Sequence, residues 1–222
     1  GPGDRVGTSA ITFAASATCA AYVGAQPVFA DVEPVAATLD PDALLRALTP
    51  RTRAVIPVHF GGQPAQMQAI REIARDRGLV VIEDAAHALG ASDAGQPVGC
   101  TSDMTIFSFH PVKHVTTGEG GAVTTNDARL ADRLRRFRNH GIERDPTRFT
   151  VASPGPWYHE MQDLGHNFRL TDMQAALGRS QLTRLGPWVE RRRAIADLYR
   201  AQLAGVAGVP GAMSSEQLAL HL

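Results

Sequence analysis

Short apolar segments alternate with segments of helical periodicity along most of this 222-residue chain. The strand-like apolar segments are residues 6–13, 27–31, 52–59, 79–84, 105–109 and 122–125. Between them, helices are predicted at residues 14–23, 40–48, 64–77 and 128–138. Strands that alternate with helices are typical of a mostly parallel sheet with helices packed on both faces. We therefore expect an α/β fold.

Individual residues indicate where several helices begin and end. Asp40 suits the N-cap of the second helix, with Pro41 in its first turn, and Gly78 suits the end of the third. Residues 146–159 have the composition of a long, polar, proline-containing loop. Two later helices are predicted at residues 171–185, beginning at Thr171 or Asp172, and at residues 188–203.

The composition excludes several classes of protein. Charges balance, with 22 basic and 22 acidic residues, so no nucleic-acid partner is expected. Apolar segments such as residues 79–82 are far too short to cross a membrane. Two cysteines, Cys19 and Cys100, argue against a disulfide scaffold and fit a reducing compartment. We therefore expect a cytoplasmic protein without a membrane partner.

Both ends of the chain resemble cut positions. It starts with a turn-like Gly-Pro-Gly-Asp instead of methionine and stops at Leu222 without a helix end or turn. We interpret it as part of a longer protein, the alternative being a processed or naturally short chain. Residues 1–186 are expected to form a large domain that lacks its N-terminal part. Residues 187–222 would then be a connecting helix and the start of a truncated, smaller C-terminal domain.

Lys113 lies in a glycine-containing stretch, residues 107–121, between two short strand-like segments. A lysine is rarely buried between strands unless its ammonium group has a partner or a task. One such task is covalent chemistry, because a desolvated lysine loses its proton more easily and can form a Schiff base with an aldehyde cofactor. The alternative is a lysine in a solvated loop with no chemical role.

Further candidate residues follow strand-like segments, where ligands gather in open α/β sheets. Asp84 closes an apolar segment, and its carboxylate would pair well with the protonated pyridine nitrogen of pyridoxal phosphate. Ser108 could donate a hydrogen bond to the cofactor phosphate, and Phe13 could stack on the ring. Lys113 would then supply the Schiff base at the other end of the ring.

Each of these residues also has an ordinary structural interpretation. Asp84 could cap the next helix, Ser108 could be a hydrogen-bonded core hydroxyl, and Phe13 could be plain core packing. His87, between alanines, is by default a buried, hydrogen-bonded histidine. The glycines at 118–121 do not match the dinucleotide-binding fingerprint, so nicotinamide binding is not expected.

Taken together, these motifs resemble those of the pyridoxal-phosphate-dependent sugar-nucleotide aminotransferases of the DegT/StrS type. The resemblance extends over essentially all 222 residues. It is carried by residues 11–13, 27–32, 49–53, 56–59, 62–64, 83–90 (EDAAHALG), 107–113 (FSFHPVK), 119–127, 138–141, 165–170 (GHNFRL) and 174–178. It implies the type I, aspartate aminotransferase-like fold, with a mixed, mostly parallel seven-stranded sheet flanked by helices.

The resemblance implies a role for each candidate residue. Lys113 would bond covalently to pyridoxal 5′-phosphate and later move the proton, and Asp84 would pair with the pyridine nitrogen. Ser108 would hold the phosphate, and Phe13 would pack on the ring. His87 would lie near the phenolic oxygen, although relatives often have glutamine there.

Asn167 is expected to act in a second subunit. By resemblance, it would reach the phosphate of the neighbouring subunit's cofactor, which implies a homodimer with a shared active site. Taken alone, it would be an ordinary loop asparagine. The family's N-terminal segment, with a small-residue turn that supplies further phosphate donors, has no counterpart in these 222 residues.

The functional hypothesis is a transaminase for cell-surface amino sugars. Some relatives carry histidine in place of Lys113 and dehydrate their substrate, so Lys113 favours amino transfer. The motifs are most similar to members that move an amino group from L-glutamate to C4 of a UDP-linked 4-keto-6-deoxy-N-acetylhexosamine, as in pseudaminic acid biosynthesis. Alternatives are a 4-amino-4-deoxy-L-arabinose-type enzyme, a type I lyase or desulfurase acting on amino acids, and a non-catalytic binding module.

Overall fold

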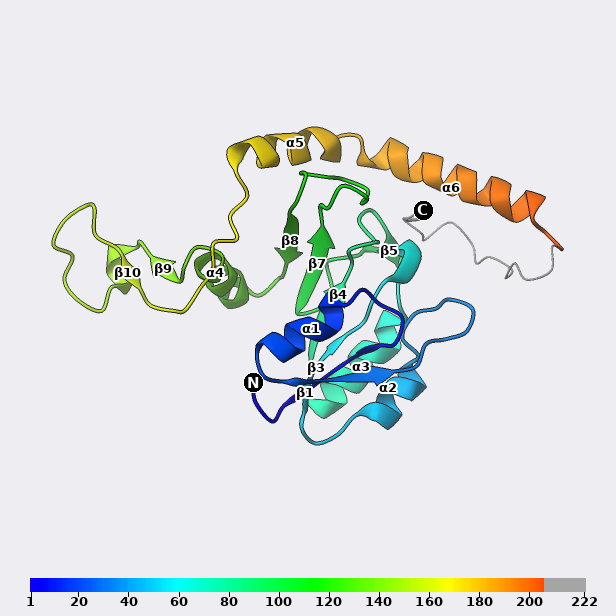
Figure 1. The fold of residues 1–222 in the computed structure, drawn as a ribbon, viewed down its shortest axis with the longest axis horizontal. Helices are drawn as coiled ribbons and strands as arrows, with labels where there is room; N and C mark the ends of the chain where they lie inside the picture. The colour runs from blue at the N-terminus through cyan, green and yellow to red at the C-terminus, as the bar shows by residue number, and fades with distance from the viewer. Residues whose placement is uncertain (206–222) are drawn as a thin grey trace.

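A six-stranded sheet forms the centre of the structure, a computed structural model that describes residues 1–205 (Figure 1). Its order is β2-β1-β3-β4-β7-β8. The strands are β1 (Arg5–Ser9), β2 (Gln26–Ala30), β3 (Thr52–Ile56), β4 (Val80–Asp84), β7 (Met104–Ser108) and β8 (Gly121–Thr124). All neighbours pair in parallel except β8, which is antiparallel to β7. This confirms the expected α/β class, and the described residues supply six of the seven strands expected.

The helices follow the strands in the alternation that the sequence predicts. They are α1 (Ala15–Tyr22), α2 (Pro41–Ala47), α3 (Met67–Arg77), α4 (Ala128–Phe137), α5 (Asp172–Leu182) and α6 (Leu185–Gln202), with short 3₁₀ turns η1 (Phe60–Gly62) and η2 (Pro146–Arg148). The side chain of Asp40 caps α2, and Gly78 ends α3 with a φ of 62°, which favours glycine. Thr171 caps α5 in a reciprocal capping box with Gln174.

Two small hairpins were not predicted. They pair β5 (Ser92–Asp93) with β6 (Gln96–Pro97) and β9 (Ile142–Glu143) with β10 (Glu160–Met161). A strand of two residues has no alternation to detect. The first predicted strand was too long: β1 ends at Ser9, whose side chain donates a hydrogen bond to the Ile11 carbonyl, so the backbone turns away from the sheet before Phe13.

The main apolar core lies under α2 and α3. Leu44 of α2, Ile70 of α3 and Val55 of β3 are fully buried in one cluster. Burial of each such side chain contributes about 1.5–3 kcal/mol to the stability of the fold. The cluster therefore holds α2 and α3 against the part of the sheet that contains β3 and β4.

A buried histidine–carboxylate hydrogen bond lies next to the last residue of β4. His59 and Glu83 are 0% and 1% exposed, and His59 Nε2 lies 2.9 Å from Glu83 Oε2. The Ala65 N–H donates to His59 Nδ1, so Nε2 carries the ring proton and donates it to the carboxylate. Burial alone would raise the pKa of Glu83, but the hydrogen bond from His59 and the positive charge of Arg71 oppose it, and the pKa is lowered.

We expect His59→Ala to destabilise the protein by about 3–5 kcal/mol, because it leaves the Glu83 carboxylate buried without its donor. Urea unfolding at neutral pH measures the loss. His159→Ala, at an exposed histidine, is the matched control and should change stability by less than about 0.5 kcal/mol. A loss of under about 1 kcal/mol in His59→Ala would show that the pair does not stabilise the sheet.

An arm projects from the β8 edge of the sheet (Figure 1). It consists of α4, the β9–β10 hairpin and residues 163–168. The Phe168 N–H donates to the Arg138 carbonyl at 2.9 Å, and the Asn139 and Asn167 backbones form an antiparallel bridge. A Cβ on Gly141 would collide with the Asp163 carbonyl oxygen, so the two segments pack backbone to backbone.

Helices α5 and α6 follow this arm. Gln174 of α5 donates to the Glu119 carbonyl at 3.0 Å, and Gln181 accepts the Thr116 N–H at 2.9 Å, which fixes α5 over the loop that carries Lys113. Among residues 1–205, no helix is both long and apolar enough to cross a bilayer. The predicted start of a smaller C-terminal domain falls mostly outside the described residues, so the boundary at residue 186 stays a prediction.

Candidate active site

Asp84 is the last residue of β4, and both of its carboxylate oxygens accept hydrogen bonds. Ser16 of α1 donates to Oδ2 at 2.6 Å, and the Ala86 N–H donates to Oδ1 at 3.1 Å. Because the Ser16 hydroxyl gives its proton to Asp84, the Thr12 hydroxyl, 2.7 Å away, must be the donor to Ser16. This chain of hydrogen bonds fixes the orientation of a half-buried carboxylate at the carboxyl end of a parallel strand.

Ser16 is a site residue that sequence reasoning missed. It lies in the first turn of an alanine-rich helix and is buried, but the chain around it has no motif of a functional serine. The only sequence signal is its spacing, three residues after Phe13, which places it in the turn facing β4.

We expect Ser16→Ala to lower turnover about 10- to 100-fold, the cost of one hydrogen bond to a charged group, while the protein stays folded. Steady-state kinetics of the complete gene product would measure this. Ala17→Ser, one residue along the same helix, is the control and should leave turnover unchanged. Equal kinetics in Ser16→Ala and the native protein would mean that Ser16 does not position Asp84.

Lys113 is the single lysine among the 222 residues. Its loop folds back on the end of β7, because the Phe109 N–H donates to the Gly120 carbonyl and its carbonyl accepts the Thr117 N–H. Burial lowers the pKa of Lys113, and the negative charge of Asp84 opposes this only in part. A larger fraction of its amine is therefore neutral, and so nucleophilic, at a given pH.

The rate at which pyridoxal phosphate is trapped on Lys113 by borohydride should reach half its maximum below pH 10.5, the ordinary pKa of a lysine amine. The direction follows from the sign of the shift, since a lowered pKa moves the neutral amine to lower pH. Peptide mass spectrometry across a pH series would measure the labelling of Lys113. A midpoint at or above 10.5 would contradict a desolvated amine.

His87 joins the same electrostatic cluster. Burial lowers its pKa most, the positive charges of Lys113 and His114 lower it further, and Asp84 opposes them. The imidazole is therefore neutral at pH 7. Its ring centroid lies 6.1 Å from that of Phe60. A neutral ring beside a carboxylate and an amine can pack flat against a planar ligand or share one hydrogen bond with it.

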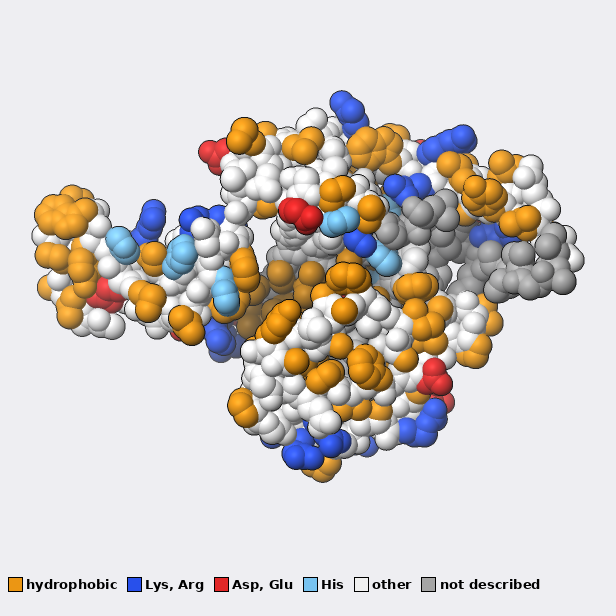
Figure 2. Space-filling model, in the orientation of Figure 1, with side chains coloured by type: hydrophobic (Ala, Val, Ile, Leu, Met, Phe, Trp, Pro, Cys, Tyr) orange, Lys and Arg blue, Asp and Glu red, His pale blue; other side chains and the backbone are white. Residues whose placement is uncertain are grey.

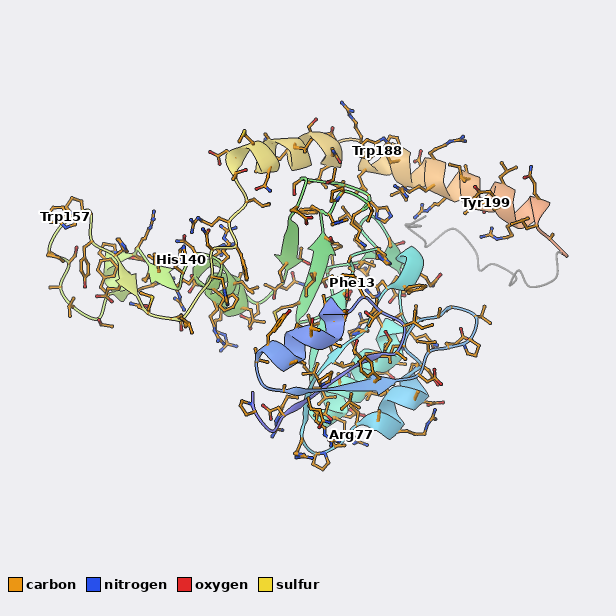
Figure 3. The ribbon with its side chains drawn as sticks, viewed as in Figure 1. Phe13, Arg77, His140, Trp157, Trp188 and Tyr199 are labelled. Atoms are coloured by element: carbon orange, nitrogen blue, oxygen red, sulfur yellow. The ribbon has the colours of Figure 1, made fainter. Side chains whose placement is uncertain are left out.

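Ser108 and Phe13 are placed differently from each other. Ser108, the last residue of β7, is half-buried, and its Oγ accepts the His110 N–H at 3.3 Å, so its own proton can be donated to a ligand. Phe13 is 78% exposed just before α1 (Figure 3), so it is not a core residue. An exposed aromatic ring of this kind is free to stack on a ligand.

Asn167 is not part of this cluster. It is exposed on the arm beside Asn139, whereas Asp84, His87 and Lys113 interact electrostatically at the carboxyl ends of β4 and β7. Its position is compatible with the expected role toward a second subunit, which stays a prediction.

The chemistry of these donors fits pyridoxal phosphate. The cofactor needs an amine that loses its proton readily, an anion for the ring nitrogen and a donor for the phosphate. Lys113, Asp84 and Ser108 provide these three groups at one edge of the sheet. No group of three or more histidine, cysteine or carboxylate side chains within residues 1–205 could hold a metal ion.

Comparison with known proteins shows the family of this chain. Residues 1–222 match the model of the DegT/DnrJ/EryC1/StrS aminotransferase family, and the chain belongs to this family. Aminotransferases of this family use pyridoxal phosphate, which confirms the predicted cofactor.

Individual members of the family are similar to this chain over most of its length. The chain is 43% identical over 209 residues to the spore coat polysaccharide biosynthesis protein SpsC of Bacillus subtilis, which covers 94% of this chain and 54% of that protein. The structure of DesV from S. venezuelae is similar with a TM-score of 0.89 and 40% identity, over 100% of this chain and 57% of that chain.

A third similar structure is PseC of Helicobacter pylori, an aminotransferase involved in pseudoaminic acid biosynthesis. Its TM-score is 0.82 and its identity 31%, over 93% of this chain and 53% of that chain. The chain spans about half the length of the curated relatives it matches.

Proposed function

We propose that the protein is a pyridoxal-phosphate-dependent transaminase that moves an amino group from L-glutamate to C4 of a nucleotide-linked 4-keto-6-deoxy sugar. The observation that carries this proposal is the cluster of Asp84, His87 and Lys113, in which a desolvated amine lies within electrostatic reach of a carboxylate held by Ser16. The family supports sugar amino transfer as the reaction class.

Lys113 and Asp84 have the two chemical roles. The bound cofactor supplies an electron-withdrawing ring that makes the adjacent carbon acidic. Lys113 Nζ holds the cofactor covalently between turnovers, and as a neutral amine it takes and returns the proton during amino transfer. Asp84 would pair with the ring nitrogen and keep that nitrogen protonated.

The remaining residues bind and orient the cofactor. Ser108 would donate its hydroxyl proton to the phosphate, and Phe13 would cover one face of the ring. His87, neutral at pH 7, would lie near the phenolic oxygen, where its lowered pKa would avoid a second positive charge beside Lys113.

The active site is proposed to be shared within a homodimer. Asn167 is bridged to Asn139 on the projecting arm and would donate to the phosphate of the neighbouring subunit's cofactor. The two cysteines are free, in keeping with a cytoplasmic enzyme.

The favoured substrate is a UDP-linked 4-keto-6-deoxy-N-acetylhexosamine of the pseudaminic acid type. The similarity to H. pylori PseC supports it. A relative from Streptomyces venezuelae is named as a dTDP-3-amino-3,4,6-trideoxy-alpha-D-glucose transaminase, so both the nucleotide and the position on the sugar vary among relatives.

A product assay tests this assignment. The complete gene product, loaded with pyridoxal phosphate, is given L-glutamate and a panel of UDP- and dTDP-linked 4-keto and 3-keto sugars, and the amino sugar is identified by mass spectrometry and NMR. The proposal expects a C4 amino product from the UDP-linked 4-keto sugar. Amination only at C3, or only of dTDP-sugars, would overturn the substrate assignment, and lyase products from amino acids would overturn the reaction class.

A further inference from the structure

The main chain of Asp84 is paired with a segment, residues 57–59, that lies beyond the end of β3. Pro57, directly after β3, has no N–H to give to a neighbouring strand. Its carbonyl accepts the Asp84 N–H at 2.9 Å, and the His59 N–H donates to the Asp84 carbonyl at 3.0 Å. The Val58 and Asp84 backbones form a parallel bridge. The position of Asp84 therefore depends on how firmly this segment is held.

The segment is followed at once by a turn. In η1, Gly61 and Gly62 have φ values of 61° and 88°, which favour glycine. Regular strand pairing therefore does not continue beyond residue 59, and side-chain bonds have to hold this end of the segment.

The His59 side chain provides such bonds at both of its ring nitrogens. Nδ1 accepts the Ala65 N–H at 3.1 Å, and Nε2 donates to Glu83 Oε2 at 2.9 Å. The histidines of the arm are exposed, and Figure 2 shows histidine side chains on the surface there, whereas His59 is 0% exposed. The buried ring cannot turn without breaking a hydrogen bond that no water replaces, so it links the segment rigidly to β4.

The end of β4 is held from both faces of the sheet. Glu83 and Asp84 are consecutive strand residues, so their side chains point to opposite faces. His59 binds the Glu83 carboxylate on one face, and Ser16 binds the Asp84 carboxylate on the other. A rotation of the strand end that displaced the Asp84 carboxylate would have to break the bond between His59 and Glu83.

We propose that His59 is a positioning residue for amino transfer, which fixes the Asp84 carboxylate where it pairs with the ring nitrogen of the cofactor. The inference rests on the proposed function, which gives Asp84 that role. His59 is fully buried and acts through Glu83 and the Asp84 main chain. A displacement of about 1 Å at a reacting group can cost about 10²-fold in rate, so a residue that does not touch the ligands can still control turnover.

The test compares His59→Ala with Leu44→Ala in the complete gene product. Leu44 is 0% exposed in the main core, so its truncation also destabilises the fold but leaves the hydrogen bonds of Asp84 in place. At a temperature where both variants are folded, His59→Ala should lower turnover about 10- to 100-fold and change the KM for L-glutamate less than about 3-fold. Leu44→Ala should keep the native turnover. His59→Gln, whose amide can still donate to Glu83, should recover most of the loss.

A second measurement needs neither cofactor nor substrate. Burial lowers the pKa of Lys113 and the negative charge of Asp84 opposes this, so a displaced carboxylate leaves the pKa lower still. Acetylation of Lys113 by acetic anhydride in the cofactor-free protein, followed by peptide mass spectrometry across a pH series, measures the midpoint. His59→Ala should lower this midpoint by about 0.5 pH unit or more, and Leu44→Ala should not shift it.

A double variant, His59→Phe with Glu83→Leu, covers the case in which His59→Ala does not fold. It replaces the buried pair with apolar side chains and leaves no unpaired buried charge, so it should fold. It should lower turnover and the Lys113 midpoint in the same direction as His59→Ala.

The outcomes separate this inference from the proposed function. If His59→Ala or the folded double variant matches Leu44→Ala in turnover and in the Lys113 midpoint, His59 contributes to stability alone, and the inference is wrong. If the native protein transfers no amino group, the proposed function fails, while the Lys113 midpoint still decides whether His59 positions Asp84.

Discussion

Lys113→Ala should abolish amino transfer, lowering the rate of the glutamate half-reaction by at least about 10³-fold. Two contributions disappear together, the covalent attachment of the cofactor and the general acid–base step, and the second alone is worth about 10²- to 10⁴-fold. Rapid mixing of cofactor-loaded protein with L-glutamate would measure the rate.

Lys113→Arg is the matched variant for this experiment. It keeps a positive charge beside Asp84, but a guanidinium is not deprotonated in proteins and cannot act as the nucleophile. It should therefore be as inactive as Lys113→Ala. Partial rescue of Lys113→Ala by ethylamine would support the proton-transfer role, because a structural lysine gives no reason for such rescue. Activity within 10-fold of native in either variant would rule out Lys113 as the catalytic amine.

Asp84→Asn is expected to lower turnover by about 10²- to 10³-fold, the usual cost of removing one preorganised electrostatic group from an active site. The amide keeps the shape of the side chain, but its single oxygen can accept only one of the two hydrogen bonds from Ser16 and Ala86, so the loss combines the missing negative charge with one missing acceptor. Most of the loss should appear in the turnover number, and little of it in the KM.

Asp76→Asn provides the control for the charge change, since Asp76 is exposed at the end of α3. It should leave turnover within about 2-fold of native, as surface substitutions generally do. If Asp84→Asn behaved like Asp76→Asn, the pairing of Asp84 with the cofactor ring would be wrong.

The fold was predictable because its signals are local and repeated. The apolar segment that ends at Asp84 and the helix that ends at Gly78 form a strand and a helix close to their predicted bounds. The end of β1 was not predictable, since residues 10–13 continue the apolar pattern while the chain turns toward α1. The β9–β10 pairing depends on contacts across the arm that no local pattern encodes.

The site was predictable where chemistry and position coincide. Asp84 closes an apolar segment and Lys113 lies in the loop after another, and the structure brings them into one electrostatic cluster with His87. Ser16 was missed because a serine in an alanine-rich helix looks like any other helical residue.

The most direct test of the central claim is the visible absorption spectrum of the complete gene product with pyridoxal phosphate. The account predicts a band that requires Lys113, disappears when L-glutamate is added, and returns when a UDP-linked 4-keto-6-deoxy sugar follows. A band that L-glutamate removes but that no ketosugar restores would indicate an enzyme acting on amino acids alone. Absence of any Lys113-dependent band would contradict the assignment of a pyridoxal phosphate site to this chain.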